Sequence, residues 1–330
     1  MHADAVLFDE HLKSIQIYNL AKLTGIEVID RDKIILDIFS KRALTTEAKL
    51  QVALAELRYE MPRAREKVRM ARMGEQPGFF GLGRYEVDVY YRSIRRRISS
   101  ISKKLRSVGK RRKLHRQSRV RYNMPTISIA GYTGVGKTTL FNLLTGESNP
   151  IAREVFTTLT TTTRAALLSS SKVLISDTVG FISRLPEYVV EAFKSTLEEL
   201  VYADLVLLVM DISDNKEDMC SKYWESISIT SELGVSPSKT LLVFNKADTV
   251  TSEDAEEIIS SVFSETEHYV LISAVTGFGI NKLKSMIDTF IFHSADEISY
   301  SDNKEVTLKE ISLNSTVASI TETKYTDVKG

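Results

Sequence analysis

The sequence predicts an α/β protein in which a small α/β unit, a hairpin of two long helices and a doubly wound, mostly parallel sheet follow one another. The sheet is predicted by five apolar segments after residue 123, which alternate with stretches of helical pattern. Each segment is apolar almost throughout, as expected for strands that are buried on both faces. The hairpin is predicted by two adjacent runs of apolar residues at alternating spacings of four and three.

Residues 1–44 are expected to form the N-terminal α/β subdomain. Short apolar runs at 5–8 and 26–29 predict strands on either side of a helix near 10–23. The apolar run at 34–39 fits either a strand or a helix.

Residues 45–122 predict an antiparallel coiled-coil hairpin; two separate amphipathic helices packed on other domains are the alternative. The seam of the first helix consists of Leu50, Leu54, Leu57, Met61, Ala64 and Val68. The seam of the second helix consists of Val87, Tyr91, Ile94, Ile98, Ile101, Leu105 and Val108. A glycine-rich loop at 74–83 separates them, and Pro62 predicts a kink or a break in the first helix.

Residues 123–294 carry the predicted sheet, and the segment 295–330 is a tail rich in serine, threonine and charge. The expected strands are 126–131, 173–176, 205–210, 240–244 and 269–272.

Composition excludes few function classes. Of the 330 residues, 43% are hydrophobic and 26% charged, and the net charge of +1 indicates no partner. The single cysteine, Cys220, excludes an intrachain disulfide and is most simply an inert side chain. The longest apolar run, 205–210, is too short to span a bilayer, and the N-terminus lacks the features of a signal peptide. We therefore expect a cytoplasmic monomer without membrane contact.

The segment G-Y-T-G-V-G-K-T at 131–138 fits the phosphate-binding P-loop pattern at every fixed position. It follows an expected strand and leads into an expected helix, the context in which backbone N–H groups surround phosphate oxygens. In this pattern Lys137 reaches the β- and γ-phosphates, and the hydroxyl of Thr138 binds Mg²⁺. The expected nucleotide contacts here are Gly131, Tyr132, Thr133, Gly134, Val135, Gly136, Lys137, Thr138 and Thr139.

The segment N-K-A-D at 245–248 ends another expected strand. The carboxylate of Asp248 can accept two hydrogen bonds from guanine, and adenine lacks that pair of donors. Because this segment comes after a P-loop and after D-T-V-G at 177–180, guanine specificity is expected. The predicted contacts are Asp177, Thr178, Val179, Gly180, Asn245, Lys246, Ala247 and Asp248, with Ser273 and Ala274 supporting the edge of the base.

The residue after D-T-V-G is Phe181, where Ras-like GTPases carry a glutamine that orients the attacking water. Phenylalanine has no donor or acceptor, so two explanations are open. Hydrolysis is slow until a partner completes the site, or another residue of this chain orients the water. We favour the first explanation, because slow intrinsic turnover suits a switch that acts only on its target.

The second helix of the hairpin is strongly basic. Residues 84–121 contain 15 Lys or Arg against two acids, Glu86 and Asp88. A solvated helix face is the simpler interpretation, but like charges at this density repel one another unless a polyanion neutralises them. We expect contact with RNA backbone rather than with specific bases. The expected contacts are Arg95, Arg96, Arg97, Lys103, Lys104, Lys110, Arg111, Arg112 and Lys113.

The stretches D-T-V-G-F-I-S-R-L-P at 177–186 and V-V-E-A-F-K-S-T-L-E-E at 189–199 resemble the HflX family of translational GTPases. The segment from Val28 to Tyr59 resembles the same family, and the similarity covers roughly residues 5–290. It implies a Ras-like P-loop GTPase domain after the two N-terminal units. It also implies a ribosome-binding GTPase that associates with the large subunit and its rRNA, in ribosome splitting, rescue or biogenesis.

The resemblance also suggests roles in the threonine-rich segment at 155–164, where six threonines follow the P-loop helix. The family's F-A-T-L-D-P-T aligns with Phe156, Thr157, Thr158, Leu159, Thr160, Thr161 and Thr162, which implies that Thr158 is the second Mg²⁺ ligand and a catalytic residue beside Lys137. The chain departs from the family at Gly134, where many members carry an asparagine that helps to bind a monovalent cation. The loop sequence at 81–85 differs from the bacterial one, and comparison with the family leads us to expect that the chain starts midway through the family's first domain.

We therefore expect a Mg²⁺-dependent GTP hydrolase that cycles between GTP and GDP on the large ribosomal subunit. Two alternatives are an RNA-binding assembly factor that uses GTP as a structural ligand with little turnover, and a GTPase accessory to tRNA modification.

Overall fold

The computed structural model describes residues 3–73, 84–121, 124–147, 161–168, 172–182, 186–262 and 269–293, and the fold is stated for these ranges. The glycine-rich loop 74–83 and the tail 295–330 lie outside them. Within the ranges, every helix is too short or too polar to span a lipid bilayer.

A parallel pair of strands opens the chain. Strand β1 (Ala5–Phe8) pairs with β2 (Glu27–Asp30), and α1 (Ser14–Thr24) connects them. Helix α2 (Arg31–Arg42) follows without a loop, because the carboxylate of Asp30 caps it by accepting a hydrogen bond from the Lys33 amide at 3.0 Å. The apolar run at 34–39 is therefore helical.

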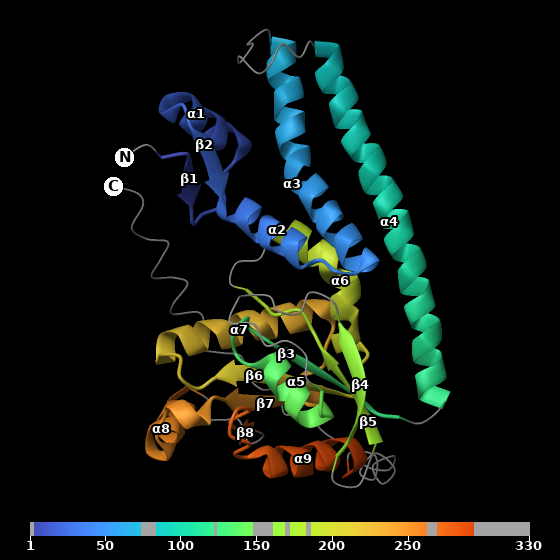
Figure 1. The fold of residues 1–330 in the computed structure, drawn as a ribbon, viewed down its shortest axis with the longest axis vertical. Helices are drawn as coiled ribbons and strands as arrows, with labels where there is room; N and C mark the ends of the chain where they lie inside the picture. The colour runs from blue at the N-terminus through green and yellow to red at the C-terminus, as the bar shows by residue number, and fades with distance from the viewer. Residues whose placement is uncertain are drawn as a thin grey trace, which may run out of the picture. The chain divides into compact units, whose positions relative to one another are not determined.

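Two long helices lie side by side and antiparallel, α3 (Thr46–Met73) and α4 (Arg84–Arg121) (Figure 1). Their seam buries Leu57 and Ala64 of α3 with Ile94 of α4, in the positions that the spacing predicted. Helix α3 continues through Pro62, so the possible break there does not occur. Proline cannot donate the helical hydrogen bond at this position, and packing of Leu57 and Ala64 on either side of it holds the helix together.

The main sheet has the strand order β4-β5-β3-β6-β7-β8. Strands β3 (Thr126–Gly131), β5 (Lys172–Asp177), β6 (Leu205–Asp211), β7 (Thr240–Asn245) and β8 (Tyr269–Leu271) are parallel. Strand β4 (Thr162–Leu167) is antiparallel and forms an edge. It was not among the expected strands, and it contains Thr162 and Thr163 of the threonine-rich segment. The expected α/β class with a mostly parallel sheet is confirmed.

Helices cover both faces of this sheet. Figure 1 shows α5 (Lys137–Thr145) and α9 (Ile280–Asp288) on one side of the strands, and α6 (Glu187–Val201) and α7 (Lys216–Leu233) on the other. Helix α8 (Ser252–Val262) lies beside α7. The core between these layers is formed mainly by the apolar strands, and β6 is buried along its whole length.

Helix α6 also packs against the N-terminal helices. Val189, Ala192 and Phe193 join a buried cluster formed by α2 and α3, and the Phe193 ring contacts Phe39 edge to face with centroids 5.1 Å apart. This cluster links the segment that follows D-T-V-G to the first half of the chain.

Candidate nucleotide-binding site

The P-loop pattern lies between β3 and α5, at the carboxyl edge of the sheet. Gly131 has φ of +140°, and a Cβ there would approach the carbonyl oxygen of Val209 to 2.3 Å. Gly136 has φ of +93°, and its Cβ would lie 2.3 Å from Nδ2 of Asn245. Both positions therefore require glycine, because conformation and space exclude a side chain. The same glycines let the loop approach Val209 of β6 and Asn245 of β7 closely.

Lys137 is the first residue of α5, and its side chain is buried. Its Nζ donates a hydrogen bond to the carbonyl oxygen of Tyr132 at 2.5 Å, so the loop closes around its own lysine. Burial lowers the pKa of Lys137 to about 8, although the charge of Asp177 partly opposes this shift. A phosphate placed beside this ammonium would favour the charged form and raise that pKa again.

Thr138 and Asp177 meet although 39 positions separate them in the chain. The Thr138 hydroxyl donates a hydrogen bond to Oδ2 of Asp177 at 2.9 Å. The register of the sheet produces this contact, because Asp177 ends β5 beside Ile129 of β3. A hydroxyl and a carboxylate together form the oxygen donor set that Mg²⁺ prefers.

The remaining residues of D-T-V-G divide between two roles. Thr178 is buried and donates to the carbonyl oxygen of Ile129 at 2.6 Å, and Val179 packs in the cluster with α2 and α3. A Cβ on Gly180 would lie 2.8 Å from Nζ of Lys137, so the backbone there lies directly against the P-loop. Of the four expected contacts, Asp177 and Gly180 face the P-loop, whereas the side chains of Thr178 and Val179 stabilise the fold.

Phe181 points its ring into the core, where it is only 2% exposed. Its backbone amide donates to the carbonyl oxygen of Gly131 at 2.9 Å, and its carbonyl oxygen accepts from the Thr133 amide at 2.8 Å. The ring meets the ring of Tyr132 edge to face, with centroids 6.5 Å apart, and the Tyr132 hydroxyl is hydrogen-bonded to Glu225 of α7. The position that would orient water in a Ras-like enzyme is therefore a packing residue.

The N-K-A-D segment reaches the same edge of the sheet through Asn245. The Asn245 side chain donates to the carbonyl oxygen of Val135 at 2.8 Å and accepts from the Ala274 amide at 2.9 Å. A single side chain thus ties the P-loop to the loop after β8. Val135 and Ala274 are predicted contacts, so these three predicted segments come together in space.

Asp248 lies beyond Asn245 and is exposed. The Ser273 hydroxyl donates to Oδ1 of Asp248 at 2.5 Å, which fixes the direction of the carboxylate. Lys246 has φ of +69° and forms an ion pair with Asp211 at the end of β6. Sequence reasoning missed Asp211; the available signal was an acid directly after the apolar strand that lies beside the strand ending in N-K-A-D.

Other predicted residues lie elsewhere. Thr139 is half-buried on α5. Phe156, Thr157, Thr158, Leu159 and Thr160 lie outside the described residues, so the second expected Mg²⁺ ligand stays a prediction. On α4 the side chains of Arg95, Arg96, Arg97, Lys103, Lys104, Lys110 and Arg111 are exposed, whereas those of Arg112 and Lys113 are outside the described set.

Comparison with known proteins gives the family. A GTPase HflX of Methanocaldococcus jannaschii is 44% identical over 284 residues, which cover 86% of this chain and 70% of that protein. The chain belongs to the HflX family. A GTPase HflX of Hyperthermus butylicus is 38% identical and covers 88% of this chain and 79% of its own length. As an HflX-family member, the protein binds guanine nucleotide and is a GTP hydrolase.

Family profiles match three successive parts of this HflX chain. They are described as GTP-binding GTPase N-terminal (residues 1–40), GTP-binding GTPase middle region (42–119) and 50S ribosome-binding GTPase (126–246). The structure also resembles a crystal structure of a GTP-binding protein from Sulfolobus solfataricus in complex with GDP. That protein is 28% identical, with a TM-score of 0.51, and the match covers 88% of this chain and 81% of the other.

Proposed function

We propose that this HflX-family GTPase is a Mg²⁺-dependent switch that acts on the large ribosomal subunit and contacts its rRNA through α4. The proposed contact with the ribosome rests on the exposed arginines and lysines of α4. This helix is the second of the hairpin and leads into β3, the strand that precedes the P-loop. The match of residues 126–246 to a profile of 50S ribosome-binding GTPases supports the same partner.

Each nucleotide contact is assigned by its position at the sheet edge. The P-loop amides and Lys137 bind the β- and γ-phosphates, and Asp248 accepts two hydrogen bonds from guanine. Ser273 orients that carboxylate through its 2.5 Å hydrogen bond. Asn245 holds the phosphate-binding and base-binding parts of the site together, because its side chain is hydrogen-bonded to both the P-loop and the loop after β8.

We assign the magnesium ion to the Thr138 hydroxyl, with Asp177 behind it and Thr158 as the second ligand. The 2.9 Å contact between Thr138 and Asp177 supports this assignment, because oxygen ligands suit Mg²⁺. When bound, the ion neutralises charge on the β- and γ-phosphates.

Helix α6 is the route by which we expect the nucleotide to influence the hairpin. It begins six residues after Phe181, and Glu191 on it forms a two-point ion pair with Arg58 of α3, with Nη2 and Oε1 2.7 Å apart. The Tyr188 hydroxyl also donates to Asp32 at 2.9 Å. A shift of D-T-V-G on GTP binding would therefore move α6 against α2 and α3, and so alter how the hairpin meets RNA.

The basic face of α4 is better explained by binding to a polyanion than by exposure to solvent alone. Two rows of exposed cations recur every seven residues and so lie along the side of α4 away from the buried Ile94 and Leu105; they are Arg96, Lys103 and Lys110, and Arg97, Lys104 and Arg111. Binding that neutralises such a row releases counterions from RNA, so affinity should depend strongly on salt.

Charge reversal on α4 tests this assignment. Changing Arg111, Arg112 and Lys113 to Glu is expected to abolish co-sedimentation with large subunits and to leave GDP affinity unchanged, because α4 leads to the amino end of β3, whereas the P-loop follows the carboxyl end of that strand. In variants in which only one of these residues is changed to Glu, the slope of log affinity against log salt concentration should become shallower by about one for each phosphate contact that is lost.

A control with the same change of charge separates a local effect from a general one. Lys41, Lys239 and Lys282 are exposed and lie on α2, before β7 and on α9. Their combined change to Glu should leave ribosome binding nearly intact. If both triple variants lost binding equally, the basic face of α4 would be an ordinary solvated surface.

A further inference from the structure

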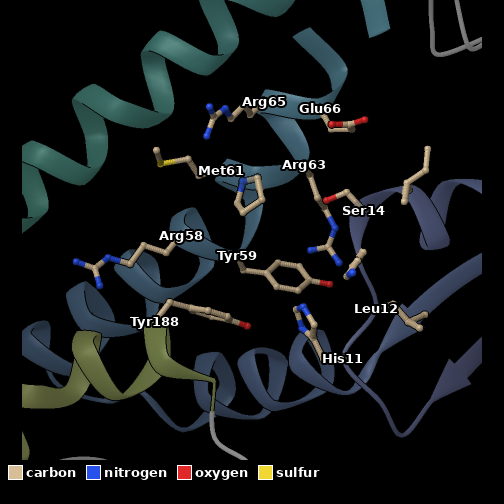
Figure 2. A pocket seen from close by; sticks show the side chains of 13 residues that line it. His11, Leu12, Ser14, Arg58, Tyr59, Met61, Arg63, Arg65, Glu66 and Tyr188 are labelled. Carbon is tan, nitrogen blue, oxygen red and sulfur yellow. The ribbon is translucent and has the colours of Figure 1, made fainter. Parts of the chain in front are cut away.

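A cavity lies away from the P-loop, between the start of α1 and the middle of α3. Its volume is about 1090 Å³, and Tyr188 of α6 forms part of its wall. Ligand pockets for small molecules have volumes of roughly 300–1,000 Å³, so the space exceeds what a bare ion would fill. Figure 2 shows Tyr59 in this cavity between the guanidinium group of Arg63 and the ring of His11.

Two buried acids, Asp30 and Asp32, do not line the cavity themselves but bond to side chains that do. Asp30 is 0% exposed and accepts from the Tyr59 hydroxyl at 2.6 Å and from Nη2 of Arg63 at 3.3 Å. Asp32 is 2% exposed and contacts the Tyr188 hydroxyl at 2.9 Å and Nδ1 of His11 at 2.7 Å. These contacts hold the cavity wall in place and direct the acids toward the donors that surround them.

Arg63 retains an unused donor. Its guanidinium carbon lies 3.5 Å from the centroid of the Tyr59 ring, so the group is fixed by stacking and by Asp30. Its Nη1 atom is buried and has no hydrogen-bond partner in the described part of the chain. A buried donor without a partner is destabilising, and an acceptor supplied by a ligand would remove that cost. The guanidinium is therefore preorganised for an oxyanion.

Two further cations line the same cavity. Lys13 precedes α1 and Arg65 follows Arg63 on α3, and neither forms an ion pair with a carboxylate in the described ranges. The acid on the wall is Glu66. The lining therefore carries Lys13, Arg63, Arg65 and Arg58, the last of which is paired with Glu191, against this one acid. The ends of Leu12, Ile15 and Met61 add apolar wall.

We propose that this cavity binds a small phosphate monoester with an apolar body. The phosphate accepts hydrogen bonds from Nη1 of Arg63 and from Lys13, and the body lies against Tyr59 and the apolar wall. A phosphate suits the site better than a carboxylate, because three oxygens can meet the separate cations at once. A divalent cation is disfavoured at Asp30 and Asp32, because the Arg63 guanidinium and two tyrosine hydroxyls already bond to these carboxylates.

Titration calorimetry with phenyl phosphate tests the proposal, with the P-loop first saturated with GDP so that phosphate cannot bind there. Saturable binding of one equivalent is expected, with inorganic phosphate weaker and phenol undetectable. Lys13→Ala should weaken binding roughly tenfold, the effect of one lost charge-assisted hydrogen bond. The matched variant Lys41→Ala, on an exposed lysine of the same N-terminal region, should bind like the wild type.

Arg63→Gln should abolish binding, and its thermal unfolding would show whether the fold survives the loss of the pair with Asp30. If that variant unfolds, Lys13→Ala and Arg65→Ala test whether the cavity binds phosphate, since neither residue bonds to the buried Asp30 or Asp32. Absence of saturable binding to the GDP-bound wild type would overturn the proposal. So would equal affinity of the wild type and Lys13→Ala, or equal affinity for phenyl phosphate and phenol.

Discussion

Wild-type protein alone is expected to hydrolyse GTP at roughly 10⁻⁴ to 10⁻² per second, the range of Ras-like enzymes without their activator. Large ribosomal subunits should raise this rate by orders of magnitude. The physical reason is the position of Phe181, whose ring is buried in the core while both of its backbone groups are bonded to the P-loop. Phe181 offers no polar side chain to orient water, so we expect a partner to complete the site.

Two substitutions separate an external activator from a missing amide. Phe181→Leu keeps an apolar side chain in the core and should leave the isolated rate within a few-fold of wild type. Phe181→Gln should also remain slow, because the backbone bonds at Gly131 and Thr133 direct the side chain inward. Thermal unfolding controls for the cost of burying an amide, about 1–3 kcal/mol.

The outcome for glutamine is informative in both directions. If Phe181→Gln alone reached the ribosome-stimulated rate, the amide would be the missing group and no external activator would be needed. If the wild type alone already matched its rate with ribosomes, a residue of this chain must orient the water. The segment Thr157–Thr163 would then be the place to search for it.

Asp248→Asn is expected to weaken GTP binding by about 2–4 kcal/mol, because a charge-assisted pair of hydrogen bonds to guanine is lost. This corresponds to a factor of roughly 30 to 1,000 in the dissociation constant. Affinity for xanthosine nucleotides should rise, since the asparagine amide can donate where the carboxylate could only accept. Ser273 donates to Asp248 at 2.5 Å, and it can equally accept from the new amide, so the local structure should survive.

Direct competition between GTP and xanthosine triphosphate measures this change of preference. Asp254→Asn is the matched control, because Asp254 is another exposed acid, on α8, that accepts a hydrogen bond from a hydroxyl. It should leave both affinities unchanged. Wild-type GTP affinity in Asp248→Asn would refute the assignment of the guanine contact.

Features with a local pattern could be predicted from the sequence. The five parallel strands follow from their apolar runs, and the hairpin seam follows from its spacing. The P-loop is set by its glycines, two of which have no room for a Cβ in the structure. Helix α2 could also have been recognised, because Asp30 precedes it as a cap and Asp32 lies in its first turn.

Features that depend on distant partners could not be predicted. Strand β4 reads T-T-R-A-A-L and has a weak apolar pattern, because an edge strand leaves Arg164, Ala165 and Leu167 exposed. The sequence shows that Phe181 is apolar, but only its contact with Tyr132 shows which way the ring points. The pairs Arg58–Glu191 and Tyr188–Asp32 join residues more than 130 positions apart, and no local signal marks them.

Co-sedimentation with purified large ribosomal subunits, in a non-hydrolysable GTP analogue and in GDP, is the decisive measurement. We expect the protein to pellet with large subunits in the analogue and to be largely released in GDP, because the nucleotide acts on α6 and through it on the hairpin. Equal binding in both nucleotides, or no binding in either, would contradict a GTP-controlled action on the large subunit.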